Sequence, residues 1–134
     1  MGWMFFGAKE FNQPIGKWNV SNVRNMNRMF DGAESFNQSL EKWDVSNVKD
    51  MNGMFNWARS FNKSLEKWKT KLSKDVDMKE MFESSGICVP VSWNKDSYKI
   101  VEENIERGEC PTAKIRMSNW RSARDAHRDA GKAE

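Results

Sequence analysis

The chain has 134 residues, of which 31% are charged and 38% hydrophobic, with seven tryptophans, eight phenylalanines and nine methionines. This aromatic content is too high for an intrinsically disordered chain, and no stretch approaches the roughly 20 apolar residues of a transmembrane helix. The net charge of +3 is a weak footprint for nucleic-acid binding, and two cysteines are too few for a disulfide scaffold.

The first residues, MGWMFFGAKEF, contain no basic segment and no long apolar run, so we do not expect a signal peptide in the sequence as given. They begin part-way through a repeating unit and leave Trp3 and Phe6 without a preceding unit. An exposed apolar edge of this kind favours pairing with another chain, which makes Trp3 and Phe6 predicted partner contacts. The alternative is that further residues precede Met1.

Tryptophan recurs every 25 residues, at Trp18, Trp43, Trp68 and Trp93. Other side chains share this period, among them Phe11, Phe36 and Phe61, Met4, Met29 and Met54, and Phe5, Phe30 and Phe55. A fixed period of this length is typical of arrays in which each unit buries its apolar face against the next. We therefore predict that the recurring residues build a scaffold and that function resides where the units differ.

Each unit combines two patterns. Apolar residues at helical spacing fill one part of it, at Val23, Met26, Met29, Phe30 and Ala33. Ser21, with Ser46 and Ser73 in later units, is the predicted N-cap of this helix, and residues 36–43 are the predicted loop and short strand. One strand and one helix per unit predict an α/β fold, a leucine-rich-repeat-like solenoid of about 3.5 strand–helix coils with a helical C-terminal cap and tail.

The phrase WNVSNVRNMNRMF, repeated as WDVSNVKDMNGMF and followed each time by alanine and FN, resembles the repeat of BspA-like surface proteins. That family is described from mycoplasmas, other bacteria, protists and large DNA viruses. The resemblance covers about residues 4–82 and implies a leucine-rich-repeat-type solenoid, surface display and protein contact, with no catalytic residues. The chain departs from the family in lacking the secretion signal of its bacterial members and in residues 83–134, which fall outside the repeat.

We divide the chain into a repeat solenoid (1–82), a C-terminal cap (83–110) and a basic tail (111–134). The cap is predicted to contain a short amphipathic helix that begins at Asp96-Ser97 and stops at Gly108. One face of this helix carries Ile100, Val101, Asn104 and Ile105. Cys88 and Cys110 bracket the cap, as a disulfide in an oxidising compartment or otherwise as two buried thiols.

The tail has the pattern of an extended linker followed by a short helix. Trp120 lies on its weakly apolar side, and Arg121, Arg124 and Arg128 share another face. These residues are predicted either to dock in a partner's groove or to contact RNA or phosphate, the latter being less favoured because aromatic interleaving is limited to Trp120. A solvated terminus is the remaining alternative.

Asparagine recurs at Asn12, Asn37 and Asn62, where each side chain is expected to bond the backbone of the neighbouring coil as a ladder. The alternative is N-glycosylation, because Asn19, Asn37 and Asn62 begin acceptor sequons. The methionines at helical spacing predict core rather than a metal site. A metal site is further disfavoured because the one histidine, His127, lies in the tail without a cysteine or second histidine near it.

Lysine precedes tryptophan at Lys17, Lys42 and Lys67, giving a predicted cationic row along one edge. This row is either a solvated edge with compensating glutamates or a docking surface for an acidic partner. Trp57 is the sharper anomaly, because its equivalents in the first two units are glycines. With Arg59 nearby, it predicts an interface anchor, or else it covers a gap in the irregular third unit.

No catalytic motif is present, neither a P-loop, a Gly-rich dinucleotide turn, a zinc-protease helix nor a nucleophile elbow. We therefore expect a non-enzymatic protein-interaction or structural solenoid that needs no cofactor or metal and contacts other protein subunits in a larger assembly. The alternative is a surface-displayed adhesion module, and the third is an RNA-associated protein that uses the tail. The resemblance suggests the cell surface or a virion-like assembly, and no membrane span is expected.

Overall fold

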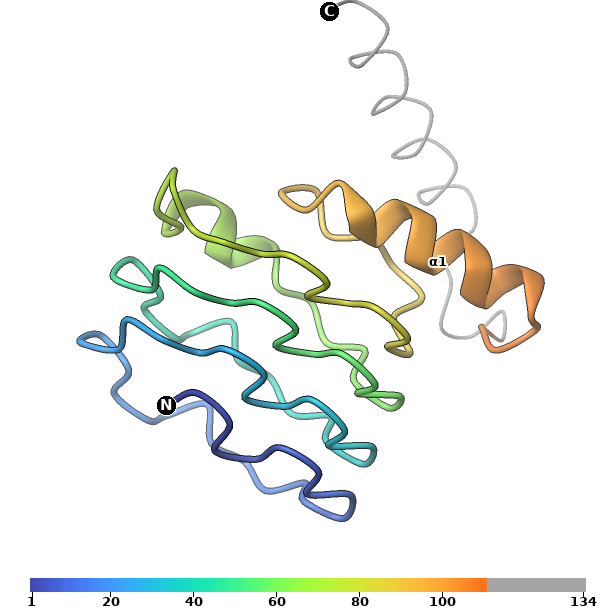
Figure 1. Ribbon diagram of the computed structural model, residues 1–134, viewed down its shortest axis with the longest axis horizontal. Coiled ribbons are helices and arrows are strands. Elements are labelled where there is room, and N and C mark those ends of the chain that lie inside the picture. Colours follow the sequence, from blue (N-terminus) through green and yellow to red (C-terminus); the bar gives the residue numbers. More distant parts are fainter. Residues whose placement is uncertain (111–134) are drawn as a thin grey trace, which may run out of the picture.

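The computed structural model describes residues 1–110. Their coils lie side by side in a stack, in chain order from the N-terminus (Figure 1). Regular elements among residues 1–110 are few, namely a 3-10 helix η1 (Glu66–Thr70) and an α-helix α1 (Asp96–Glu106). In this described part, extended structure is limited to isolated parallel bridges that join Asn25 to Asp50 and Asp50 to Asp77. The predicted α/β, leucine-rich-repeat-like solenoid of strand–helix coils is therefore wrong.

The segment predicted as an amphipathic helix is instead a series of tight turns. Along residues 26–33, backbone N–H groups alternate between a turn within the coil and an acceptor in the next coil. Met29 donates to the Met26 carbonyl oxygen at 3.2 Å, whereas Phe30 donates to the Met54 carbonyl oxygen of the next coil at 2.9 Å. Two consecutive turns of four residues place apolar side chains at the same spacing as a helix, which explains why the pattern predicted one.

Left-handed backbone prevents these turns from joining into a helix. Arg28 has a φ of 51° and Gly32 a φ of 75°, and an α-helix of L-residues does not accommodate either value. Gly32 therefore closes a turn.

The serines predicted as helix N-caps instead form hydrogen bonds within local turns. The Ser46 backbone N–H and hydroxyl both donate to the Asp44 carboxylate, at 3.1 and 2.7 Å, and Ser21 bonds Asn19 in the same way. The Ser73 hydroxyl likewise donates to the Asp75 carboxylate. The bonds at Asn19 and Asp44 form Asx-type turns, in which the side chain accepts the backbone N–H two residues on without starting a helix, whereas the Ser73 bond joins two side chains.

The Asx turn at Asp44 gives a pH-dependent prediction. The Ser46 hydroxyl and backbone N–H hold the pKa of the Asp44 carboxyl below its ordinary value. A lowered folded-state pKa contributes stability above the unfolded value of about 3.9, and this contribution is lost as pH falls through the folded value. Ser46→Ala should raise the Asp44 pKa in an NMR titration, with Ser21→Ala as the matched control. An unchanged Asp44 titration in Ser46→Ala contradicts this account.

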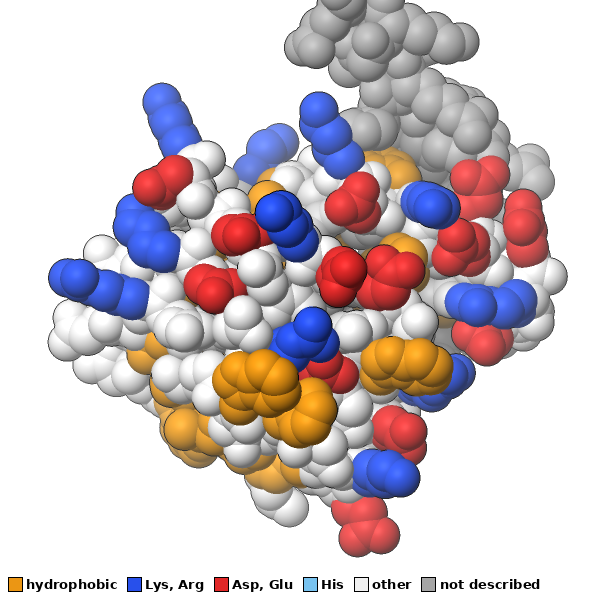
Figure 2. All heavy atoms as spheres, in the orientation of Figure 1, with side chains coloured by type: hydrophobic (Ala, Val, Ile, Leu, Met, Phe, Trp, Pro, Cys, Tyr) orange, Lys and Arg blue, Asp and Glu red, His pale blue; other side chains and the backbone are white. Residues whose placement is uncertain are grey.

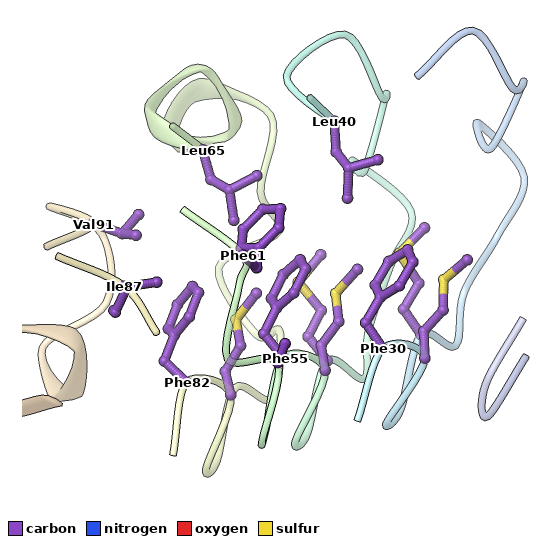
Figure 3. Packing of buried hydrophobic residues seen from close by; sticks show 14 of the residues in the cluster. Phe30, Leu40, Phe55, Phe61, Leu65, Phe82, Ile87 and Val91 are labelled. Carbon is purple, nitrogen blue, oxygen red and sulfur yellow. The ribbon is translucent and has the colours of Figure 1, made fainter. Parts of the chain in front are cut away.

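Aromatic rings form continuous columns through the core. Phe55 stacks between Phe30 and Phe82, with ring centroids 5.5 and 5.6 Å apart (Figure 3). Phe36 stacks on Phe61, with ring centroids 5.9 Å apart. Beside these columns, five methionines are buried, namely Met26, Met29, Met51, Met54 and Met81. The prediction that the methionine stripe is core is therefore confirmed, although Met78 is only half-buried.

Asparagine side chains join the other half of each coil to its neighbour, where the predicted strand does not form. The Asn37 N–H donates to Asn12 Oδ1 at 2.8 Å, and the Asn62 N–H donates to Asn37 Oδ1 at 3.0 Å. Asn62 Oδ1 in turn accepts the Cys88 N–H at 3.0 Å. The predicted ladder is confirmed, and it replaces the backbone pairing of a sheet.

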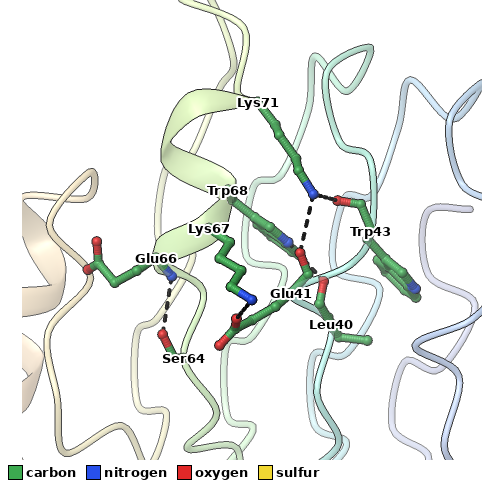
Figure 4. Close-up of polar contacts among 8 residues, drawn as sticks. All are labelled: Leu40, Glu41, Trp43, Ser64, Glu66, Lys67, Trp68 and Lys71. Carbon is green, nitrogen blue, oxygen red and sulfur yellow. Dashed lines mark hydrogen bonds and ion pairs between the residues drawn. The ribbon is translucent and has the colours of Figure 1, made fainter.

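The recurring tryptophans also link coils. Trp43 Nε1 donates to the Ile15 carbonyl oxygen at 3.0 Å, and Trp68 Nε1 donates to the Leu40 carbonyl oxygen at 2.9 Å (Figure 4). Trp93 completes the series with a bond to the Leu65 carbonyl oxygen at 2.9 Å. Each indole therefore satisfies a carbonyl of the preceding coil while its ring fills the core.

The helix α1 covers the last coil. Its Ile100 and Val101 are buried, and the buried Asn104 amide donates to the carbonyl oxygens of Ser85 and Ile87 at 2.8 and 2.9 Å. These contacts confirm the predicted helix and its apolar face. Its first turn, however, is bonded by Asn94, whose side chain accepts the Ser97 N–H at 3.1 Å, and not by Asp96 or Ser97.

Cys88 and Cys110 form a disulfide, the first of the two alternatives left open by the sequence. It ties the chain that follows α1 back to the coil that α1 covers. Within residues 1–110, no helix is long and apolar enough to cross a membrane.

Candidate partner-binding surface

Each coil contains two positions with left-handed backbone, and equivalent positions stack on one face. The first set is Trp3, Arg28, Gly53 and Glu80, and the second is Gly7, Gly32, Trp57 and Ser84. Left-handed backbone suits glycine and costs other residues roughly 1–2 kcal/mol each. The fold by itself would favour glycine at these positions. The presence of a large side chain there therefore indicates a role other than maintaining the fold.

Trp57 is the clearest case. Its φ is 60°, its side chain is 46% exposed, and the Arg59 guanidinium lies 4.8 Å from the ring centroid. The fold needs only glycine there, as Gly7 and Gly32 show in the equivalent turns. Because Trp57 combines backbone strain with exposure, it does not fill a gap in the core, and strain of this kind gathers at functional sites.

Trp3 repeats this arrangement on the first coil. It has a φ of 65° and is 53% exposed, and its ring lies 4.7 Å from that of Phe6. The Arg28 guanidinium lies 5.6 Å from the Trp3 ring and forms an ion pair with Asp31 at 2.7 Å. Asp31 therefore fixes Arg28 beside the aromatic pair.

Arg28 also reaches toward the third coil. A Cβ added to Gly53 would lie 3.2 Å from Arg28 Cγ, so glycine at position 53 leaves room for this side chain. Arg28 is not among the functional residues predicted from the sequence. One feature of the sequence could have pointed to Arg28. Trp3, Arg28 and Gly53 occupy the same repeat position but differ from one another, whereas the core positions repeat almost unchanged.

We name this surface the Trp–Arg face, comprising Trp3, Phe6, Arg28, Trp57 and Arg59. The structure pairs Trp57 with Arg59, and it places Arg28 over the Trp3 ring, which contacts Phe6. Figure 2 shows large hydrophobic side chains exposed on this face, beside basic side chains, with mostly polar surface around them. Indole rings and guanidinium groups are suited to stacking and hydrogen bonding, which are the contacts of protein-interface hot spots.

The lysine row lies on the segments behind those of the Trp–Arg face in Figure 1. Lys17 and Lys42 line a shallow pocket of about 420 Å³ together with Pro14, Gly16, Gln38 and Ser39. Lys67 forms an ion pair with Glu41 of the preceding coil at 3.4 Å (Figure 4). The row is therefore partly compensated, as the solvated-edge alternative expects.

The predicted tail residues Trp120, Arg121, Arg124 and Arg128 lie outside the described residues. Among residues 1–110, no group of three or more His, Cys, Asp or Glu side chains is placed to hold a metal ion. The carboxylate of Asp31 adjoins the Trp–Arg face, where it is ion-paired with Arg28.

Residues 1–90 match the family model described as "Mycoplasma protein of unknown function, DUF285". No curated protein and no solved structure matches the chain. The matched range contains the stacked coils and the Trp–Arg face, and it ends before α1.

Proposed function

This chain belongs to the DUF285 family of Mycoplasma proteins of unknown function, and from that premise we propose that it is a non-enzymatic module that binds a protein partner through the Trp–Arg face. Trp57 carries the proposal, because a large exposed aromatic occupies a left-handed position where glycine would suffice. The core accounts for the repeating residues, whereas this face is where the units differ. Tryptophan and arginine are the residue types most enriched at interface hot spots.

A second observation favours display of this module at the cell surface. Disulfides persist in oxidising environments and are rare where thiols are kept reduced. The Cys88–Cys110 bond therefore supports adhesion over a role as a subunit inside the cell. The resemblance of the repeat to BspA-like surface proteins points the same way.

Replacing Trp57 by glycine tests the proposal. We expect Trp57→Gly to weaken partner binding strongly while the free energy of unfolding stays unchanged or rises by about 1 kcal/mol, because the left-handed strain is relieved. Binding is measured by affinity capture from a mycoplasma or host surface fraction with quantitative mass spectrometry. Stability is measured by urea denaturation.

Val89→Ala is the matched control, since Val89 is another large exposed apolar residue and lies outside the Trp–Arg face. Proteins retained by the parent and by Val89→Ala but lost with Trp57→Gly would support the proposal. Identical capture by all three chains, or a large loss of stability in Trp57→Gly, contradicts it. A stoichiometric complex would make the chain an assembly subunit, whereas weak reversible capture fits adhesion.

A further inference from the structure

A glutamate joins each of the later coils to its neighbour along the lysine row. Glu41 of the second coil forms an ion pair with Lys67 of the third coil at 3.4 Å (Figure 4). Glu66 has the same repeat position in the third coil, and its carboxylate accepts the Ser92 backbone N–H and hydroxyl of the next coil at 2.7 and 2.6 Å. In both cases the glutamate that precedes lysine and tryptophan holds a donor of the coil that follows.

The first coil has glycine at this position. In the register of the later coils, a carboxylate at position 16 would pair with Lys42, but Gly16 has no side chain. A Cβ added to Gly16 would lie 2.7 Å from the Ser39 carbonyl oxygen, so the packing of the backbone keeps this position free of a side chain. Lys42 is exposed, and no carboxylate within residues 1–110 forms an ion pair with it. The repeat therefore lacks a carboxylate at a point where it elsewhere provides one.

A pocket lies where this carboxylate is missing. Its volume is about 420 Å³, and it is lined by Pro14, Gly16, Lys17, Gln38, Ser39 and Lys42. The ammonium groups of Lys17 and Lys42 are suited to binding an anion, and the Ser39 hydroxyl makes no hydrogen bond within residues 1–110. No carboxylate lines the pocket. Both Gly16 and Lys42 are internal to the repeats, so the missing carboxylate does not depend on where the chain begins or ends.

We propose that this pocket binds the carboxylate of a glutamate or aspartate in an acidic peptide segment of a protein partner. The pairing of Glu41 with Lys67 in the next pair of coils is the template for this contact, because it joins a peptide glutamate to a lysine at the same repeat position. The last described residue, Cys110, is bonded to Cys88 at the far end of the stack from this pocket (Figure 1). The pocket belongs to the lysine row behind the Trp–Arg face, so the two sites do not compete.

The probe is the blocked peptide acetyl-Gly-Glu-Glu-Gly-amide, with its glutamine counterpart as the uncharged control. Titrated into the full chain at constant ionic strength, the glutamate peptide should shift the NMR resonances of the Lys42 side chain, and the glutamine peptide should not. Lys42→Gln should weaken binding at least about tenfold, the effect of removing a charged hydrogen-bond partner. Lys42→Arg should retain binding, because a guanidinium also pairs with carboxylates.

Lys67→Gln is the matched control variant, because Lys67 has the same repeat position as Lys42 but already pairs with Glu41. It should bind the glutamate peptide as the parent does. Trp57→Gly should also bind it as the parent does, which separates this site from the Trp–Arg face. Because the Lys42 side chain is exposed, Lys42→Gln should keep the Tm of the parent.

Absence of a Lys42 shift up to about 10 mM glutamate peptide overturns the proposal, as does equal binding of the glutamine peptide. Tighter binding of glucuronic acid than of the glutamate peptide would overturn the peptide as occupant in favour of an acidic sugar. The Asp125→Asn, Asp129→Asn double variant should leave the Lys42 resonances of the free chain unchanged. A change there would make residues 111–134 of this chain the occupant, and would also overturn the proposal.

Discussion

Replacing Trp43 by alanine is expected to lower the free energy of unfolding by about 3–5 kcal/mol, the range for truncating a buried large aromatic. Its ring is fully buried against Phe30, with centroids 6.3 Å apart, and its indole holds the Ile15 carbonyl. Alanine leaves a cavity in the middle of the stack and an unpaired buried carbonyl. Because the total free energy of unfolding of a small domain is roughly 5–15 kcal/mol, this change should unfold a large fraction of the protein near physiological temperature.

Trp18→Ala is the matched control, because it makes the same chemical change at the same repeat position. Trp18 belongs to the first coil, is partly exposed and holds no carbonyl within residues 1–110. We expect it to cost about 1 kcal/mol, in proportion to the smaller area that it buries. Urea denaturation followed by far-ultraviolet circular dichroism compares the two variants. Equal losses would show that burial between coils does not determine the contribution of the recurring tryptophans.

The stacking of repeats could be predicted from the sequence because it depends on recurrence alone. Asn12, Asn37 and Asn62 recur without variation, and a polar residue that repeats inside an array has to satisfy its neighbour's backbone. The burial of the recurring methionines and phenylalanines could be predicted by the same reasoning. These features do not depend on the backbone conformation of each unit, so they were predicted correctly even though the helix and the strand predicted within each repeat were not.

The local conformation could not be predicted, because two consecutive four-residue turns give the apolar spacing of a helix. The distinguishing feature is the left-handed backbone at positions such as Arg28 and Gly32. At position 32 the glycine is the only signal of a left-handed turn. It does not distinguish a turn from the end of a helix, because glycine also commonly ends helices. Nothing in the residue type signals it at Arg28, whose conformation is imposed by its hydrogen bonds to the adjacent coil and by its ion pair with Asp31.

A residue of the candidate site could be predicted from the sequence where it replaces a residue that the other units share. It could not be predicted at a repeat position where every unit has a different residue. Trp57 stood out because Gly7 and Gly32 precede it in the array. Arg28 did not stand out, because its contact with Trp3 depends on a coil-to-coil register that only the structure reveals. The grouping of Trp3 and Phe6 with an arginine is thus a product of stacking.

Removing the disulfide is expected to lower the free energy of unfolding by about 3 kcal/mol, the loop-closure value for cysteines separated by 22 residues. The bond closes a loop that contains α1, so without it the unfolded chain gains freedom while the native contacts of α1 remain. The Cys88→Ser, Cys110→Ser double variant should show this loss in urea. The parent treated with a thiol reductant should show the same loss.

Reductant should leave the double variant unchanged, which separates the disulfide from other effects of the reagent. Asn104 is the second tie between α1 and the coils, through the Ser85 and Ile87 carbonyls. If the double variant unfolds like the oxidised parent, α1 is held by these bonds and its apolar face alone, and the disulfide argument for surface display loses its support. If stability falls as expected, the disulfide stabilises the folded chain beyond the contacts that α1 makes by itself, and this added stability is lost wherever the bond is reduced.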